Sequence, residues 1–296
     1  MTAPRPPERP AGSFDGPAQL QQGPAGPPPE GPAGPAGRPG EAADRQQLIA
    51  RLAQAGCVAA DEEADELLAS AAGDPDRLAR LVGRRITGEP LAWVTGGLWW
   101  AGEWIRVDPG VYVPRWETAA LARRAVELLP ADGVAVDLCT GSGAVAAVLT
   151  RARPGARVVA TDLDPAACRC AVGNGVEVYC GHLADPVPAE LRGRVDVVVA
   201  VVPYVPEDAL AYLPRDVQAF EPRLALDGGP EGIRLLGDAI RAAAELLRPG
   251  GTVLLELGAG QDGLVAPVLA EAGFDPPVLH VDEDGDLRGV EAERRS

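Results

Sequence analysis

The sequence predicts an α/β fold in which helices cover both faces of a parallel β-sheet. From residue 134 onward, short apolar runs rich in valine or leucine alternate with glycine turns and helical segments. Apolar runs without polar alternation are typical of strands that are buried on both faces. The predicted strands lie at 134–138, 157–161, 195–202 and 252–257, and the predicted helices lie near 143–152, 165–172 and 231–247.

Length and composition agree with one sizeable core and a small second domain. The chain has 296 residues, of which 46% are hydrophobic, and a chain of this size can bury a substantial core. No stretch approaches the roughly 20 apolar residues that span a bilayer, and the N-terminus has no apolar signal region. We therefore expect a cytoplasmic protein without membrane contact, and we expect it to be a monomer.

The charge balance narrows the choice of partners. The formal net charge is −16, and no Lys/Arg cluster opposes it. Such a field repels nucleic acid, so we expect no direct nucleic-acid binding and favour a protein or small-molecule substrate. The five cysteines show no Cys-x-x-Cys spacing and the chain has only two histidines. We therefore expect no metal site and interpret the cysteines as small buried side chains.

Two segments precede the predicted sheet domain. Residues 1–42 are predicted to be a disordered tail, because 12 of the 30 prolines and 8 of the 36 glycines fall in the first 40 residues and such a segment cannot bury enough apolar area to fold. Residues 43–92 are predicted to form a helical substrate-recognition domain. Asp61 is a candidate cap for its second helix, and Asp74 followed by proline is typical of the start of a third.

All five tryptophans fall between Trp93 and Trp116, in short extended runs broken by glycines. This pattern predicts a β-hairpin linker at 93–116, followed by the sheet domain at 117–296. The rings either fill the core between the two domains or line a substrate groove, and the sequence leaves both interpretations open.

A glycine-rich turn with acidic neighbours follows the first predicted strand. Residues 137–143 read Asp-Leu-Cys-Thr-Gly-Ser-Gly, and a second acid, Asp162, ends the next strand. Glycines let a ligand approach the backbone, the following helix offers free N–H groups, and an acid at the second strand end can accept both hydroxyls of a ribose. The turn therefore indicates a nucleotide-like cofactor.

The identity of that cofactor follows from charge. A dinucleotide site requires a third glycine where this chain has Ala146, and Asp137 would repel a pyrophosphate. The same acid suits a cofactor that carries an ammonium group and a sulfonium. We therefore favour S-adenosylmethionine over a nicotinamide cofactor. The remaining alternative is a glycine turn that binds no ligand.

Six ordered motifs carry a family resemblance. They are the linker segment 85–96, the Val-Pro-Arg-Trp-Glu-Thr segment 113–118, the turn 137–143, the segment 201–204, the Glu-Pro-Arg-Leu-Ala-Leu-Asp-Gly-Gly segment 221–229, and Leu-Glu-Leu-Gly at 255–258 with Gln261. With these motifs the chain resembles the release factor glutamine methyltransferases over about residues 84–290. The resemblance implies a Rossmann-like class I S-adenosylmethionine-dependent methyltransferase sheet.

The resemblance also implies an activity and a set of site residues. The expected reaction is methyl transfer from S-adenosylmethionine to a glutamine side-chain amide of a protein, a peptide chain release factor with a Gly-Gly-Gln motif. Substrate contacts are expected from Arg115, Glu117, Glu221 and Arg223. The alternatives are that Arg115 and Glu117 only pair with each other on the surface, and that Glu221 and Arg223 only cap a loop. The cofactor contacts are expected from Asp137, Cys139, Thr140, Gly141, Ser142, Gly143, Asp162, Leu163, His182, Leu183 and Val201, and the catalytic segment is Val201, Val202, Pro203 and Tyr204.

Two positions depart from the family pattern. The family's Asn-Pro-Pro-Tyr motif holds the substrate amide through the Asn side chain and a backbone carbonyl, and Val201 replaces that Asn. An amide proton without an acceptor in a dry site costs roughly 1–3 kcal/mol. His182 stands where the family usually has Asp beside the adenine. It is expected either to contact the adenine or to be a tolerated edge residue.

Three functions therefore remain from the sequence. The leading one is protein glutamine methylation. The second is a degenerate paralogue that binds the cofactor with weak or no activity, which Val201 motivates. The third is amino-methylation of a small molecule or a nucleic-acid base, since an exocyclic nitrogen poses the same problem of orientation.

Overall fold

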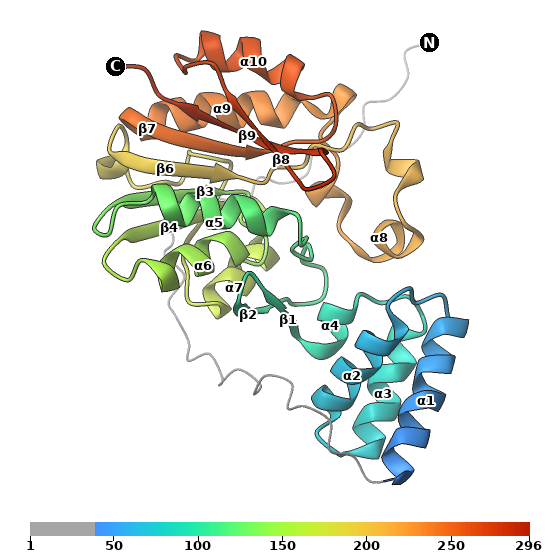
Figure 1. Ribbon diagram of the computed structural model, residues 1–296. Coiled ribbons are helices and arrows are strands. Elements are labelled where there is room, and N and C mark those ends of the chain that lie inside the picture. Colours follow the sequence, from blue (N-terminus) through green and yellow to red (C-terminus); the bar gives the residue numbers. More distant parts are fainter. Residues whose placement is uncertain (1–38) are drawn as a thin grey trace, which may run out of the picture.

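The computed structural model describes residues 39–296, and side chains from residue 44 onward (Figure 1). The predicted tail at 1–42 lies almost wholly outside this range. Where the two overlap, at residues 39–42, the chain already belongs to the first helix.

Three helices form a bundle at the N-terminal end of the described chain. They are α1 (Pro39–Gln54), α2 (Ala60–Ala71) and α3 (Pro75–Arg85), and they pack around a small cluster that includes the buried Leu52 and Leu67. Asp74 caps α3 as predicted, since its Oδ1 accepts hydrogen bonds from the N–H groups of Asp76 and Arg77 at 2.9 and 3.0 Å.

The predicted cap of α2 is wrong. The helix begins at Ala60, one residue before Asp61, and its N-cap position is Ala59, which makes no side-chain cap. The start is shifted because Ala60 is buried in the bundle. Asp61 still lies in the first turn, where a negative charge interacts favourably with the helix dipole.

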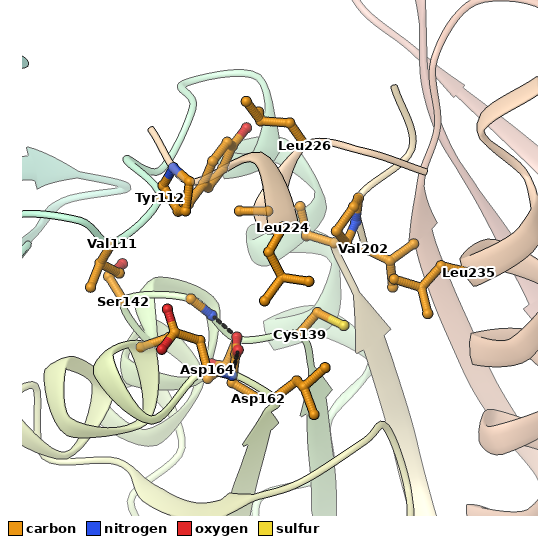
Figure 2. A pocket seen from close by; sticks show the side chains of 18 of the residues that line it. Val111, Tyr112, Cys139, Ser142, Asp162, Asp164, Val202, Leu224, Leu226 and Leu235 are labelled. Carbon is orange, nitrogen blue, oxygen red and sulfur yellow. Dashed lines mark hydrogen bonds between the residues drawn. The ribbon is translucent and has the colours of Figure 1, made fainter. Parts of the chain in front are cut away.

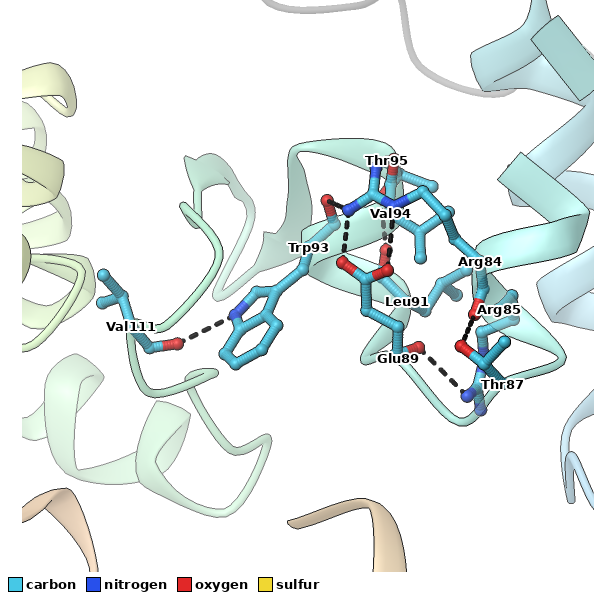
Figure 3. Close-up of polar contacts among 9 residues, drawn as sticks. All are labelled: Arg84, Arg85, Thr87, Glu89, Leu91, Trp93, Val94, Thr95 and Val111. Atoms are coloured by element: carbon cyan, nitrogen blue, oxygen red, sulfur yellow. Dashed lines mark hydrogen bonds and ion pairs between the residues drawn. The ribbon is translucent and has the colours of Figure 1, made fainter. Parts of the chain in front are cut away.

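A short linker joins the bundle to the sheet domain. It contains helix α4 (Leu91–Thr95) and an antiparallel hairpin of β1 (Gly97–Trp100) and β2 (Glu103–Arg106). Figure 3 shows how the linker is held: Arg84 at the end of α3 pairs with Glu89 and donates from Nη2 to the Trp93 carbonyl at 3.0 Å. On the far side of α4, the Trp93 indole Nε1 donates to the Val111 carbonyl at 2.9 Å.

The main sheet has seven strands in the order β5-β4-β3-β6-β7-β9-β8. The first five of this order are parallel to one another, as predicted, and β9 and β8 add an antiparallel edge. The strands are β3 (Val134–Leu138), β4 (Arg157–Asp162), β5 (Glu177–Cys180), β6 (Val195–Ala200), β7 (Leu247–Glu256), β8 (Val278–Val281) and β9 (Leu287–Glu293).

The sequence missed β5 and the antiparallel edge for a physical reason. Strand β5 begins with Glu177 and β9 mixes charged with apolar residues, so neither has the continuous apolar run that marked the inner strands, and β8 is only four residues long. The predicted strand at 195–202 is too long, because β6 ends at Ala200. The predicted strand at 252–257 is too short at its start, because β7 begins at Leu247.

Helices cover both faces of the sheet (Figure 1). One face packs against α5 (Thr118–Leu128), α6 (Ala144–Ala152) and α7 (Pro165–Gly173). The other packs against α9 (Arg234–Leu246) and α10 (Asp262–Glu271). A short helix, α8 (Arg215–Phe220), extends from the sheet domain toward the linker, where Phe220 meets the Trp93 ring edge-on at 6.4 Å.

The tryptophans follow neither interpretation as a group. Trp93 and Trp100 are buried, and Trp100 also lines the main cavity, whereas Trp99 and Trp116 are exposed and lie outside its lining. The cysteines divide as well: Cys170 is buried as expected, but Cys180 is exposed and its sulfur is bonded to that of Cys168. None of the helices within residues 39–296 is both long and apolar enough to cross a bilayer.

Replacement of Trp93 by Phe tests the anchoring of the linker. The Trp93→Phe variant keeps most of the buried ring but leaves the Val111 carbonyl without its donor. Its free energy of unfolding should fall by about 1–3 kcal/mol, the cost of an unpaired buried acceptor. The half-exposed Trp99 is the matched control, and Trp99→Phe should change the value by no more than about 0.5 kcal/mol. Urea unfolding followed by circular dichroism measures both, and equal values for the two variants would contradict the anchoring role.

Candidate functional site

A cavity of about 320 Å³ opens at the carboxyl ends of the central parallel strands. This edge is where open α/β sheets bind their ligands, and the volume is that of a small-molecule site. Figure 2 shows Asp162 and Cys139 on the side of the strand ends, with Leu224, Leu226 and Val202 across the cavity from them. The cavity therefore has a polar end and an apolar end.

The turn between β3 and α6 forms the polar end. Cys139 and Gly141 both adopt left-handed backbone conformations, with φ of 58° and 56°, and the turn is held to the neighbouring strand by a hydrogen bond from Thr140 N to Thr161 O at 3.0 Å. At Gly143, with φ of 81°, a Cβ would come within 2.7 Å of the Ala171 side chain. Only glycine fits there, because both the conformation and the packing exclude a side chain.

Asp137 lies buried under this turn. Its Oδ2 accepts hydrogen bonds from Thr140 Oγ1 at 2.6 Å and from Ala146 N at 3.2 Å. No donor to Oδ1 exists among the described residues, although the side chain lines the cavity. Burial raises the pKa of Asp137 to about 7, since removal from water disfavours the ionised form.

Asp162 ends the neighbouring strand and is held just as firmly. Its Oδ2 accepts from Gly141 N at 2.8 Å and its Oδ1 accepts from Asp164 N at 2.9 Å. Burial raises its pKa above the usual range for a carboxyl. A buried carboxylate and a half-buried one on adjacent strand ends, with no salt bridge to either within residues 44–296, make the polar end attractive to a cation and repellent to a phosphate.

The structure brings most of the predicted cofactor residues together. Leu183 is buried, while Leu163 and His182 are exposed at the rim next to Asp162. Gly143 is absent from the lining, because its role is packing against α7. The predicted residues that line the cavity are Asp137, Cys139, Thr140, Gly141, Ser142, Asp162, Leu163, His182, Leu183, Val201, Val202, Pro203 and Tyr204.

The segment after β6 forms the other end of the cavity. Val201, Val202, Pro203 and Tyr204 all line it. The Tyr204 hydroxyl donates to Glu256 Oε1 at 3.0 Å, and burial raises the pKa of Tyr204 well above its usual value. This tyrosine is therefore a neutral hydroxyl that is fixed in place.

The backbone of this segment is held by the residues that follow it. Val205 N donates to Leu226 O at 3.1 Å, and Gly228 N donates back to Val205 O at 2.9 Å. The Gln261 side chain donates from Nε2 to the Tyr204 carbonyl at 2.9 Å. At Gly232 a Cβ would lie 2.0 Å from that carbonyl, so glycine is required for the close approach.

The four residues predicted to contact substrate lie outside the cavity lining. Arg115 Nη2 donates to Glu221 Oε1 at 2.6 Å. This bond connects the segment before α5 with the segment that leads into the apolar wall at Leu224. The Glu221 side chain is nearly buried, and its other oxygen has no partner among the described residues. Arg223 is exposed and pairs with Asp227 and Glu207. Arg115 and Glu117, considered as a surface pair, do not pair with each other in the described chain.

Sequence reasoning missed several residues of the apolar wall. Tyr112 precedes a recognised motif by one residue, and Leu224 and Leu226 lie inside another, so their proximity to motif residues was the available signal. Asn174 carried no signal at all. Its Nδ2 donates to Ser142 O at 2.8 Å and to Arg106 O at 2.9 Å, so it ties the hairpin to the cofactor turn. The missed lining residues include Val111, Tyr112, Thr118, Leu224, Leu226, Arg234 and Leu235.

Comparison with known proteins gives a consistent result. The FtsJ-like methyltransferase family matches residues 120–264. A release factor glutamine methyltransferase of Moorella thermoacetica is 39% identical over 71% of this chain and 75% of its own length. One of Mycolicibacterium smegmatis is 42% identical over 62% and 68%.

Two further similarities concern a different substrate and a solved structure. A 4-amino-L-phenylalanine/4-methylamino-L-phenylalanine methyltransferase of Streptomyces pristinaespiralis is 36% identical over 79% of this chain and 83% of its own length. Among solved structures, the Mtq2-Trm112 complex of E. cuniculi, which methylates the termination factor eRF1, is 22% identical with a TM-score of 0.45, covering 62% of this chain and 99% of that one.

The parallel sheet, the glycine turn and the paired acids at the strand ends define a class I S-adenosylmethionine-dependent methyltransferase. The residues fit this cofactor, because a buried and a half-buried carboxylate, neither paired with a basic side chain within residues 44–296, suit a ligand that carries positive charge. The identities to curated relatives then show that the chain belongs to the release factor glutamine methyltransferase family.

Substitution of Asp137 tests the charge of the polar end. Its carboxyl has a pKa of about 7 in the folded chain and an ordinary value near ~3.9 when unfolded. The folded state therefore holds the proton more tightly, and stability falls as pH rises through this window. Without cofactor, Asp137→Asn should be more stable than wild type above neutral pH by on the order of 2–4 kcal/mol, with the difference shrinking toward pH ~4.

The same variant should bind S-adenosylmethionine at least tenfold more weakly, because an amide carries no charge. Denaturant unfolding across pH and isothermal calorimetry measure the two effects. Asp164→Asn is the control, since Asn can keep the cap of α7 that Asp164 provides through Ala166 N. Wild-type affinity in Asp137→Asn would contradict the role of this charge.

Proposed function

We propose that this methyltransferase acts on the side-chain amide of a glutamine in a protein, a peptide chain release factor with a Gly-Gly-Gln motif. The observation that carries the proposal is the 39% identity to a release factor glutamine methyltransferase over most of both chains. The order of the six sequence motifs supports it, since they include the turn at 137–143, the segment 201–204 and the segment 221–229 that packs against it.

Each end of the cavity has a proposed role. Asp137 is suited to the ammonium group of the cofactor's amino-acid portion, through the oxygen that has no internal donor. Asp162 is suited to the ribose hydroxyls, with Leu163, His182 and Leu183 beside the adenine. When bound, the cofactor supplies an electrophilic methyl group on a sulfonium.

The apolar end is the proposed acceptor site. An amide nitrogen is a weak nucleophile because its lone pair is delocalised into the carbonyl, so the protein must orient it toward the methyl group. The backbone carbonyls at Val202 and Pro203 are proposed to do this. The residues that follow them, Tyr204 and Val205, are fixed by hydrogen bonds to Gln261, Leu226 and Gly228. Tyr204 then packs beside the amide.

Val201 makes this site weaker than the family pattern. It lines the cavity but offers no side-chain acceptor, so one amide proton of a bound glutamine lacks a partner. At roughly 1–3 kcal/mol for that loss, methyl transfer is slowed by one to two orders of magnitude. We propose an enzyme that is active but slow. Its rate is closer to that of a degenerate paralogue than the family pattern predicts, but it is not inactive.

The surrounding segments are proposed to shape the entrance for the protein substrate. The Arg115–Glu221 pair joins the linker to the wall that contains Leu224, and burial raises the pKa of Glu221, as expected for a carboxyl in a closed interface. The helical residues up to 92 are proposed as the substrate-recognition domain, next to the linker at 93–116. We propose a cytoplasmic monomer as the setting of this function.

Restoration of the amide acceptor tests the proposal. Purified wild-type protein and the Val201→Asn variant are incubated with labelled S-adenosylmethionine and a Gly-Gly-Gln release factor. We expect transfer by wild type and a rate about ten- to hundredfold higher in Val201→Asn. Val201→Leu is the matched control, because leucine has the shape of asparagine without the oxygen, and it should give no increase.

The outcomes separate the three functions that the sequence allowed. Transfer only in Val201→Asn would identify a degenerate paralogue. Transfer to 4-amino-L-phenylalanine in a parallel reaction, with none to the release factor in either variant, would replace the proposal by small-molecule amino-methylation.

A further inference from the structure

A buried carboxyl group lies directly behind the acceptor end of the cavity. Glu256 ends strand β7 and is only 4% exposed. Its Oε1 accepts the hydrogen bond from the Tyr204 hydroxyl at 3.0 Å, and its Oε2 accepts one from the Thr118 hydroxyl. Tyr204 and Thr118 line the cavity and Glu256 does not, so two hydroxyls separate the carboxylate from the bound substrate.

The proposed reaction releases a proton that some group must accept. The substrate nitrogen forms a bond to the methyl carbon, the carbon–sulfur bond breaks, and its electron pair stays on sulfur. The nitrogen then carries one proton too many and must lose it. No residue of the segment 201–203 can accept a proton, because its side chains are those of valine and proline.

We propose that Glu256 is the final acceptor of this proton, with the Tyr204 hydroxyl as the carrier between the cavity and the carboxylate. The proposal rests on the function proposed above. The nitrogen gives its proton to the Tyr204 oxygen while the Tyr204 proton passes to Glu256 Oε1, so tyrosine ends as it began and Glu256 becomes a neutral acid.

The charges also balance in a dry site. Before the reaction, a positive sulfonium and a negative Glu256 carboxylate are present. Afterwards the thioether, the methylated amide and the protonated Glu256 are all neutral. Loss of both charges together is favourable where water is excluded, because each ion is costly to keep there.

The groups around Glu256 suit a proton acceptor. Burial raises its pKa, and the hydrogen bonds from Thr118 and Tyr204 oppose that effect. Of the nearby charges, Glu117 raises the pKa and Arg288 on β9 lowers it. Burial raises the pKa of Tyr112 to about 12 and that of Tyr204 still higher. Both tyrosines are therefore neutral at physiological pH, and Tyr204 keeps the proton that it donates to Glu256.

The test compares Glu256→Gln with wild type by single-turnover methyl transfer across pH. Wild type should show a rate that rises with pH as Glu256 ionises and then levels. Glu256→Gln should lower the plateau about 100-fold and abolish the rise, while calorimetry with S-adenosylhomocysteine shows unchanged affinity. Thr118→Val is the matched control: it removes one hydrogen bond to the carboxylate and should move the rise to higher pH without abolishing it.

A second readout does not depend on activity. The infrared difference spectrum of wild type minus Glu256→Gln reports the carboxyl band of Glu256, which should titrate over the same pH range as the rate. A Glu256 that stays protonated wherever the protein is folded would overturn the proposal. So would a Glu256→Gln variant that keeps the pH-dependent rate, which is the result expected if the residue only positions Tyr204.

If wild type transfers no methyl group to the release factor, the function proposed above fails. In that case the infrared titration still measures whether the Glu256 carboxyl ionises in the folded protein, so the two failures are distinguishable.

Discussion

The site depends on two carboxylates, one buried and one half-buried, that pair with no basic side chain in the described part of the chain. Asp137 and Asp162 are held at adjacent strand ends by backbone and hydroxyl donors, and burial raises the pKa of both. Such an arrangement costs stability in the empty protein, and a neutral turn would fold better. A ligand that brings positive charge offsets this cost. The negative charge of the carboxylates also excludes the pyrophosphate that a similar turn binds in dinucleotide enzymes.

The acceptor end depends on backbone rather than on side chains. Val201 and Pro203 contribute no donors or acceptors of their own beyond the main chain, yet the segment is fixed by Gln261 and by close packing at Gly232. A fixed carbonyl can orient an amide without an asparagine, although less strongly. In the proposed function, this segment keeps the backbone acceptors and loses the side-chain acceptor at Val201.

The sequence predicted the parts of the molecule that local chemistry determines. The apolar inner strands, the Asp74 cap and the turn at 137–143 are all readable from residue type and spacing. Contacts between distant segments were not readable: nothing near Glu256 in the sequence indicates Thr118, 138 residues away. Asn174 was missed for the same reason, since only the fold brings it close to Ser142 and Arg106.

The charge of Asp137 can be followed directly when the cofactor binds. A carboxyl with a pKa of about 7 is partly protonated at neutral pH, and an ammonium beside it favours the ionised form, so binding must expel a proton. Calorimetry of S-adenosylmethionine binding near pH 7, repeated in buffers with different heats of ionisation, measures that proton. The account predicts a net release that Asp137→Asn abolishes. Binding heats that are the same in every buffer, or an absence of binding, would contradict it.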